Sequence, residues 1–340
     1  MISPVLRPAS VWIRANWRTL LLYLGMAIAL SFTDHRMRRF PDYVVTTYIP
    51  QVVQGNADAP GRYRVLVPFV VDTLTRATGG SPMIVFLAVR LCLLYAALLA
   101  THRLLQNWFT PLIATGGTGL LAALLPLTYT NSWAHPDSVV ELLLLAAGCA
   151  LIVSKRDGWF AAVLVAAAFN RETSAFLLLL WAWERLAESR SWPMLIRVAG
   201  VGSAWWAVFL GLRWVRGFAS YEYWMLPRNI AAFVPLPDNF DPYVRISGLL
   251  WLCLAVPLLV LAAAGVKRMG WSSYFGRTTI VAGSLLVTGF LISSVLESRI
   301  FVPLLPLLIP PALVGLGAEP REPVVRPLSA ALDADDSSRS

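Results

Sequence analysis

Apolar residues along this chain gather into about ten helix-length runs, which short polar stretches separate. A helix that crosses a membrane needs roughly 20 apolar residues, and fewer when it packs inside a bundle. Helices are expected because hydrocarbon offers the backbone no water as a hydrogen-bond partner. The expected spans are 19–33, 83–105, 111–130, 138–153, 158–169, 173–186, 194–214, 248–266, 278–295 and 300–316. The pattern therefore predicts an all-α fold, a polytopic transmembrane helix bundle of about ten spans.

Two of the expected spans, 158–169 and 173–186, are too short to cross a membrane alone if fully helical. They could equally form one helix that Asn170, Arg171 and Glu172 interrupt. Ionisable residues at membrane depth are costly, so a functional role is the first hypothesis for this interruption. We expect Arg171 to bind phosphate and Glu172 to orient it. The alternative is an internal Arg171–Glu172 ion pair, or a turn at the edge of the bilayer.

Composition supports the membrane class. Hydrophobic residues make up 57% of the chain, charged residues only 14%, and the mean hydropathy is +0.64, which exceeds what a water-soluble core requires. The three cysteines lie inside apolar runs without metal-ligand spacing, so neither a disulfide framework nor a metal site is expected. The net charge of +9 is spread between the spans, which favours membrane lipids over nucleic acid as partners. The sequence has no glycine-rich nucleotide loop, and we expect no cofactor.

Basic residues next to several spans mark one side of the expected membrane. They are Arg7, Arg14, Arg18, Lys155, Arg156, Arg185, Arg190, Lys267 and Arg268. By the positive-inside rule this side is cytoplasmic, and an even number of spans puts both termini there, in an inner or plasma membrane. The first span has a basic start and the small-residue sequence Ala29-Leu30-Ser31, like a signal peptide, but we expect an uncleaved anchor.

The expected organisation is one transmembrane domain, residues 1–316, with two substantial outer loops at 34–82 and 215–247. The first of these loops is expected to carry short interfacial helices. After about Gly317 the chain becomes Pro-rich and then Asp- and Ser-rich. We therefore expect residues 317–340 to form a disordered cytoplasmic tail.

The residues that could do chemistry fall on the opposite, non-cytoplasmic side. They are Asp34, Asp42, Arg62, Arg64, His135, Asp137, Asn170, Arg171, Glu172, Glu297 and Arg299. His135 and Asp137 are counted as candidate binding residues, although an H-x-D pattern alone is too weak for a metal site. Arg90, in the middle of the second span, is expected to pair within the bundle or to extend toward its edge.

The first outer loop presents two arginines beside an interfacial segment. Arg62 and Arg64 are two residues apart, so in an extended segment both side chains point the same way. Pro68 can begin a helix, and the apolar residues after it alternate with polar ones as in a helix lying on a membrane surface. Arg62 and Arg64 are therefore candidate phosphate ligands. The alternative is that they only anchor the loop at the level of the lipid headgroups.

Asp34 and Asp42 are the acidic candidates in this loop. A carboxylate near the outer edge of the membrane can serve as general base for a hydroxyl acceptor. Each has a structural alternative, because Asp34 can pair with a basic neighbour such as His35 or Arg36, and Asp42 follows Pro41 as a turn or helix-capping residue would.

A second Glu/Arg pair, Glu297 and Arg299, lies at the outer junction of the last two spans. The prolines that follow it, from Pro303 to Pro311, are expected to kink or break the final helix. The pair is a candidate for substrate binding, with a capping ion pair as the alternative.

These patterns make the chain resemble the GT-C class of membrane glycosyltransferases, over most of residues 15–316. The resemblance rests on the acids of the first outer loop, on Tyr63-Arg64-Val65-Leu66-Val67-Pro68, on Asn170-Arg171-Glu172-Thr173 and on Glu297-Ser298-Arg299. Enzymes of this class transfer sugars from polyprenyl-phosphate donors on the outer side of the membrane. Many members carry two adjacent acids in the first outer loop, whereas Asp34 and Asp42 are separate. The choice of base thus stays open, and no catalytic divalent metal is expected.

The resemblance implies an inverting transfer in which Asp42, or else Asp34, deprotonates a hydroxyl of a glycan or lipid acceptor. The candidates to stabilise the departing polyprenyl phosphate are Arg62, Arg64, Arg171 and Arg299. Two other functions fit part of the pattern. A transporter or flippase of an anionic lipid or solute would place its polar residues near the midplane, whereas here they gather toward one face. A polysaccharide polymerase or ligase would also use outer arginines and would differ in product length.

Overall fold

The computed structural model describes residues 9–37, 42–128, 137–219, 225–226, 229, 242–293 and 298–321. These residues form helices and no strands. The α-helices are α1 (Ala9–Met37), α2 (Ile49–Gln54), α3 (Leu66–Thr78), α4 (Pro82–Leu105), α5 (Pro111–Leu124), α6 (Asp137–Val153), α7 (Asp157–Asn170), α8 (Ala175–Glu188), α9 (Trp192–Arg216), α11 (Pro242–Met269), α12 (Tyr274–Ile292) and α13 (Leu305–Gly315). Shorter helical segments are η1 (Val44–Tyr48), η2 (Gly61–Tyr63), η3 (Leu125–Thr128), η4 (Glu172–Ser174) and η5 (Ser298–Leu304). The all-α prediction is confirmed.

In the part of the chain that the structure describes, four helices are long and apolar enough to cross a membrane. They are Pro82–Leu105, Pro111–Thr128, Trp192–Arg216 and Tyr274–Ile292. Each of the other predicted spans also coincides with a helix, and the crossing of the membrane by these helices stays a prediction. The prediction of about ten spans is therefore confirmed only in part.

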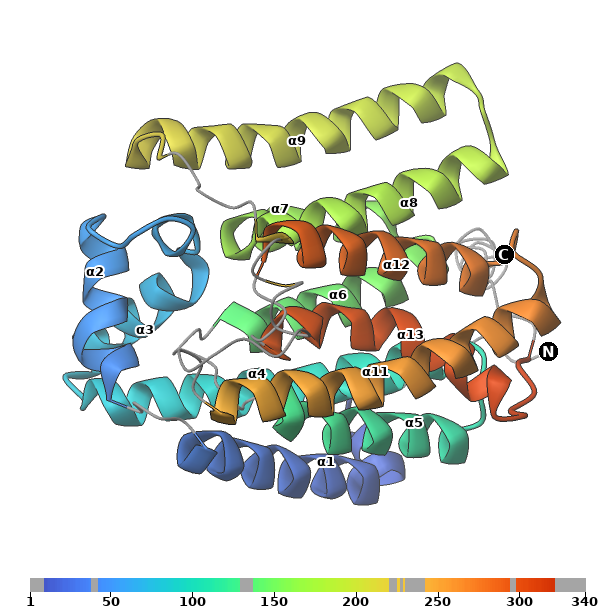
Figure 1. The fold of residues 1–340 in the computed structure, drawn as a ribbon, viewed down its shortest axis with the longest axis horizontal. Helices are drawn as coiled ribbons and strands as arrows, with labels where there is room; N and C mark the ends of the chain where they lie inside the picture. Colours follow the sequence, from blue (N-terminus) through green and yellow to red (C-terminus); the bar gives the residue numbers. More distant parts are fainter. Residues whose placement is uncertain are drawn as a thin grey trace, which may run out of the picture.

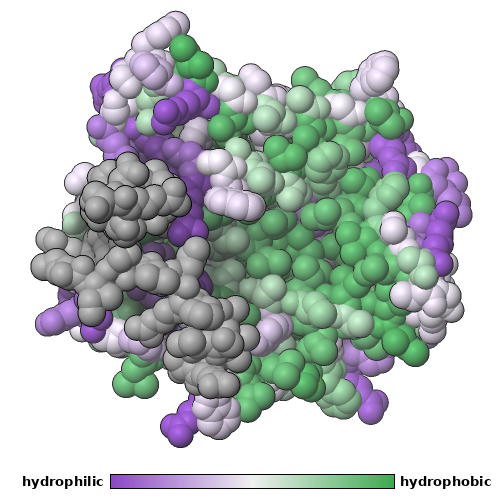
Figure 2. Space-filling view, turned by 180° about the vertical axis from the view of Figure 1, so that it is seen from behind, coloured by the Kyte–Doolittle hydropathy of each residue, from purple (hydrophilic) through white to green (hydrophobic). Residues whose placement is uncertain are grey.

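The long helices lie side by side in a bundle, and α2 and α3 gather at one end of it (Figure 1). We call this the α3 end. Hydrophobic side chains cover much of the middle of the face in Figure 2, and hydrophilic ones lie toward its edges. This distribution agrees with a bundle whose middle is surrounded by hydrocarbon.

The centre of the bundle is α13, whose residues from Leu305 to Val314 are all buried. The predicted break by prolines is partial, because η5 ends at Leu304 and α13 then continues through Pro310 and Pro311. Helix α13 touches α11 backbone to backbone. A Cβ atom built on Gly265 would lie only 1.9 Å from the carbonyl oxygen of Pro311, so this crossing requires glycine.

Helices α7 and α8 form an antiparallel hairpin rather than one interrupted helix. Asp157, at the start of α7, accepts hydrogen bonds from Arg185 Nε at 2.8 Å and Trp181 Nε1 at 2.9 Å near the end of α8. The turn between them begins at Arg171, whose backbone is extended with φ −157° and ψ 146°. The hairpin therefore delivers its polar turn to the α3 end, next to the start of α6 (Figure 1).

Candidate functional site

A buried network of charged side chains lies at the α3 end. Arg64 contacts Asp137 at 3.0 Å, and Arg171 Nε lies 3.3 Å from the same carboxylate. Arg171 also pairs with Glu141, one helical turn further along α6. Asp137 and Glu141 are four residues apart and so lie on one face of that helix. We call Arg64, Asp137, Glu141, Arg171 and Glu172 the ionic network.

Hydrogen bonds, two of them to backbone carbonyls, hold the elements of this network together. The N–H of Val65 donates to the carbonyl of Phe169 at 3.1 Å, and Asn170 Nδ2 donates to the carbonyl of Asp137 at 3.0 Å. Thr173 Oγ1 donates to Glu141. These bonds join three segments: the first loop, the start of α6 and the turn after α7. Side chains that are distant in sequence can therefore meet at this place.

Burial sorts the acids of the network into two kinds. The side chains of Asp137 and Glu141 are only 1% and 4% exposed, and each contacts an arginine closely. Such buried charges remain only because they are paired. Glu172 is different, because its side chain is 34% exposed and its carboxylate lies 3.8 Å from Arg64. It is the acid that a ligand can reach.

Tyr48 and Arg299 are buried beside this network. Burial raises the pKa of the Tyr48 hydroxyl, and the nearby Asp137 raises it further, against the lowering effect of Arg64 and Arg299. Burial alone would lower the pKa of Arg64, but Asp137 and Glu172 more than offset this, so the net effect raises it. The phenol therefore stays neutral and the guanidinium stays charged.

Arg62 does not join the network, which corrects the expectation that Arg62 and Arg64 point the same way. Residues 61–63 form the 3-10 turn η2 rather than an extended segment, so the side chains diverge. Arg62 donates to the carbonyls of Ala57 at 2.9 Å and Arg216 at 3.3 Å. It thus satisfies a carbonyl at the C-terminus of α9.

The C-terminus of α9 is held by the same short loop. Tyr63 donates its hydroxyl to the carbonyl of Gly217 at 2.7 Å and accepts from the N–H of Ala219 at 3.0 Å. The Arg213 guanidinium lies 4.5 Å from the centre of the Tyr63 ring. Arg216 donates to the carbonyl of Val52 at 2.9 Å. The first loop and α9 are therefore fixed to one another at the α3 end.

The two acids proposed as general bases occupy different settings. Asp34 is buried in an ion pair with Arg90 of α4, which also donates to the carbonyl of Ser31 at 3.1 Å. The expectation that Arg90 pairs within the bundle is confirmed. Asp42 is exposed, and its carbonyl accepts from the N–H groups that begin η1. His135 and Glu297 lie outside the described residues.

Glu141 and Tyr48 belong to the site but were not among the predicted residues. Glu141 carries a recognisable signal, because it is a carboxylate inside the apolar run of α6 and one turn from Asp137. Tyr48 carries none, since a tyrosine in a loop is common. Within the described ranges, no group of three His, Cys, Asp or Glu side chains is placed to hold a metal ion.

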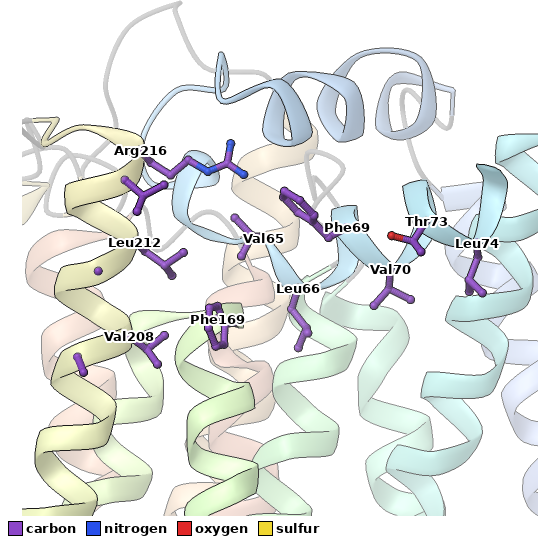
Figure 3. A pocket seen from close by; sticks show the side chains of 13 residues that line it. Val65, Leu66, Phe69, Val70, Thr73, Leu74, Phe169, Val208, Leu212 and Arg216 are labelled. Carbon is purple, nitrogen blue, oxygen red and sulfur yellow. The ribbon is translucent and has the colours of Figure 1, made fainter. Parts of the chain in front are cut away.

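An apolar groove of about 960 Å³ runs between α3 and α9, and Phe169 at the end of α7 contributes to its lining (Figure 3). Its lining residues are Val65, Leu66, Phe69, Val70, Thr73, Leu74, Phe169, Ala207, Val208, Gly211, Leu212, Val215 and Arg216. The groove therefore passes within two residues of the ionic network on two separate segments, since Val65 follows Arg64 and Phe169 lies two residues before Arg171.

A scan against protein-family models finds no match to the chain, and neither the curated proteins nor the solved structures give one.

Proposed function

We propose that this protein is a membrane glycosyltransferase that transfers a sugar from a polyprenyl-phosphate donor to an acceptor hydroxyl at the α3 end of the bundle. The observation that carries the proposal is the apolar groove beside the ionic network. A prenyl chain needs an apolar channel open to lipid, and its phosphate needs arginines. The groove and Arg64 are adjacent in the chain through Val65.

In the proposed reaction, Asp42 accepts the proton of the acceptor hydroxyl, and the oxygen attacks the anomeric carbon of the sugar. The bond from this carbon to the phosphate oxygen breaks, and the polyprenyl phosphate leaves with the electron pair. Arg64, with Arg171 and Arg299 close to it, would stabilise the negative charge that grows on the leaving group. Arg62 has no part in this step, because its Nε donates to the carbonyl of Ala57 and its Nη1 to that of Arg216.

Asp42 is the better base because it is exposed, whereas the buried carboxylate of Asp34 is occupied by Arg90. Asp42 also begins the segment that ends at Tyr48, beside the network. An acceptor at the surface of the α3 end can therefore reach it.

The test is transfer from a radiolabelled polyprenyl-phosphate sugar by the purified, reconstituted protein. Asp42→Asn is expected to reduce turnover about 100-fold or more, because a general base contributes that much. The matched control is Asp72→Asn, which removes an acid of α3 that pairs with Arg76 through a partly exposed contact. Full turnover in Asp42→Asn would remove Asp42 from the reaction, and no transfer by the wild-type protein with any lipid-linked sugar would refute the proposed function.

A further inference from the structure

Within the described ranges, one edge of the Arg64 guanidinium group has no hydrogen-bond acceptor. Asp137 accepts from Nη1 at 3.0 Å, which leaves the edge formed by Nε and Nη2. Among the described residues, none accepts a hydrogen bond from the buried Nε. A guanidinium edge of this kind presents two parallel N–H groups, which match two oxygens of a phosphate or carboxylate. Leaving a buried donor without an acceptor is costly.

Glu172 is the acid next to this edge, but its carboxylate is too far away to accept a hydrogen bond from it. Its carboxylate lies 3.8 Å from Nη2, beyond the 2.7–2.9 Å range of a charge-assisted hydrogen bond. In the part of the chain that the structure describes, the Glu172 carboxylate accepts no hydrogen bond. It is also 34% exposed, whereas the side chain of Arg64 is 7% exposed. Glu172 is therefore not a buried acid, and its carboxylate can move away from Arg64 toward solvent.

We propose that the Nε and Nη2 edge of Arg64 is a binding site for a phosphate group, and that Glu172 is a built-in competitor that the incoming phosphate displaces. This inference rests on the proposed function for the identity of the phosphate, which is the headgroup of a prenyl lipid. Asp137 stays on Nη1 throughout and holds the guanidinium in place. Displacement costs little, because a long ion pair to a partly exposed carboxylate adds little stability.

The exchange has a consequence for affinity. Because Glu172 and the phosphate compete for one edge, removing the charge of Glu172 should strengthen phosphate binding. A residue that binds or orients the ligand would have the opposite effect when it is replaced. The sign of the change in phosphate affinity therefore distinguishes a competing Glu172 from a Glu172 that binds or orients the ligand.

The experiment measures the affinity of the detergent-purified protein for farnesyl phosphate, with farnesol and inorganic phosphate as separate ligands. Glu172→Gln is expected to bind farnesyl phosphate about threefold more tightly, or more, than the wild type. Glu188→Gln, which removes one negative charge from the opposite end of the bundle, should leave the affinity unchanged. In Arg64→Lys, which keeps the charge but loses the edge, the further change Glu172→Gln should give no gain.

Thermal unfolding of each variant identifies any protein that has lost its fold. A gain that also occurs with inorganic phosphate supports the phosphate site and shows that the prenyl chain is not needed. Unchanged or weaker binding by Glu172→Gln overturns the inference, as does a gain that persists on the Arg64→Lys background. Transfer activity without the gain would refute this inference alone, whereas the gain without any transfer activity would refute only the proposed function.

Discussion

The N–H of Val65 donates a hydrogen bond to the carbonyl of Phe169 at 3.1 Å, across more than a hundred residues of sequence. This bond joins the first loop to the end of α7. The two bonded residues line the apolar groove, and their neighbours Arg64 and Asn170 belong to the polar site. One backbone contact thus brings an apolar channel and a charged cluster together, as a lipid with a charged headgroup requires.

Filling the groove should weaken donor binding. Gly211 lines the groove, and a Cβ atom built on it meets no other atom within 4 Å, so Gly211→Trp can be accommodated without a clash near the backbone. We expect the KM for a lipid-linked sugar to rise about tenfold with little change in kcat, because lost apolar contacts of this size cost roughly 1–3 kcal/mol.

The matched control is Gly200→Trp on the same helix, which is equally open but does not line the groove. Steady-state kinetics in proteoliposomes measure both variants. An equal rise in KM in both would show that the bulk of the tryptophan on α9 matters, rather than the groove.

Removing one acid of the ionic network should destabilise the fold. Glu141 is buried and holds both Arg171 and Thr173, so Glu141→Ala removes one of the two carboxylates that pair with the buried Arg171 guanidinium and leaves it only Asp137. The expected loss is about 3–5 kcal/mol in the free energy of unfolding, measured by denaturant titration in detergent micelles. Glu188→Ala breaks the exposed pair with Lys155 and a longer contact with Arg185 at 3.5 Å. It should cost less than about 1 kcal/mol, because Glu188 is exposed and Arg185 keeps its pair with Asp157. Similar losses in the two variants would contradict the assignment of Glu141 to a buried network.

The pair of Asp34 and Arg90 should behave as a unit. Asp34→Leu alone leaves the Arg90 charge buried between α1 and α4, and Arg90→Leu alone leaves the carboxylate. Each single change should cost about 3–5 kcal/mol, while the double variant should recover most of that loss. Thermal or denaturant unfolding of the four proteins gives the coupling energy. Additive losses would show that the two side chains do not depend on one another.

The contact of α11 with α13 depends on the absence of a side chain. A methyl group at Gly265 would meet the carbonyl of Pro311 at 1.9 Å, so Gly265→Ala must push the helices apart. We expect a loss of about 1–3 kcal/mol or more in stability. Gly283→Ala on α12 has open space around its Cβ and should be nearly neutral. Equal stability of both variants would contradict this helix contact.

Much of the fold was predictable from the sequence, because an apolar run of helical length is a local signal. Every predicted span coincides with a helix, and the amphipathic α3 begins near Pro68 as expected. The hairpin of α7 and α8 was one of two open alternatives. Its outcome depends on Asp157 meeting Arg185, a contact between two helix ends that a linear pattern does not reveal.

The candidate site was only partly predictable, because its geometry depends on local turns and on distant pairings. Arg64, Asp137, Arg171 and Glu172 do come together, although the sequence alone gave no partner for Asp137. The predicted direction of the Arg62 side chain was wrong, because the 3-10 turn η2 has no strong sequence pattern that would have indicated it. Glu141 could have been found by asking why a carboxylate interrupts an apolar helix.

The most direct test of the account is a cryo-electron microscopy structure of the protein with a bound polyprenyl phosphate. We predict density for the prenyl chain in the groove between α3 and α9, with the phosphate within hydrogen-bond distance of Arg64 Nε and Nη2, and with Glu172 turned away. A chain that lies on another face of the bundle, or a phosphate far from Arg64, would contradict the account.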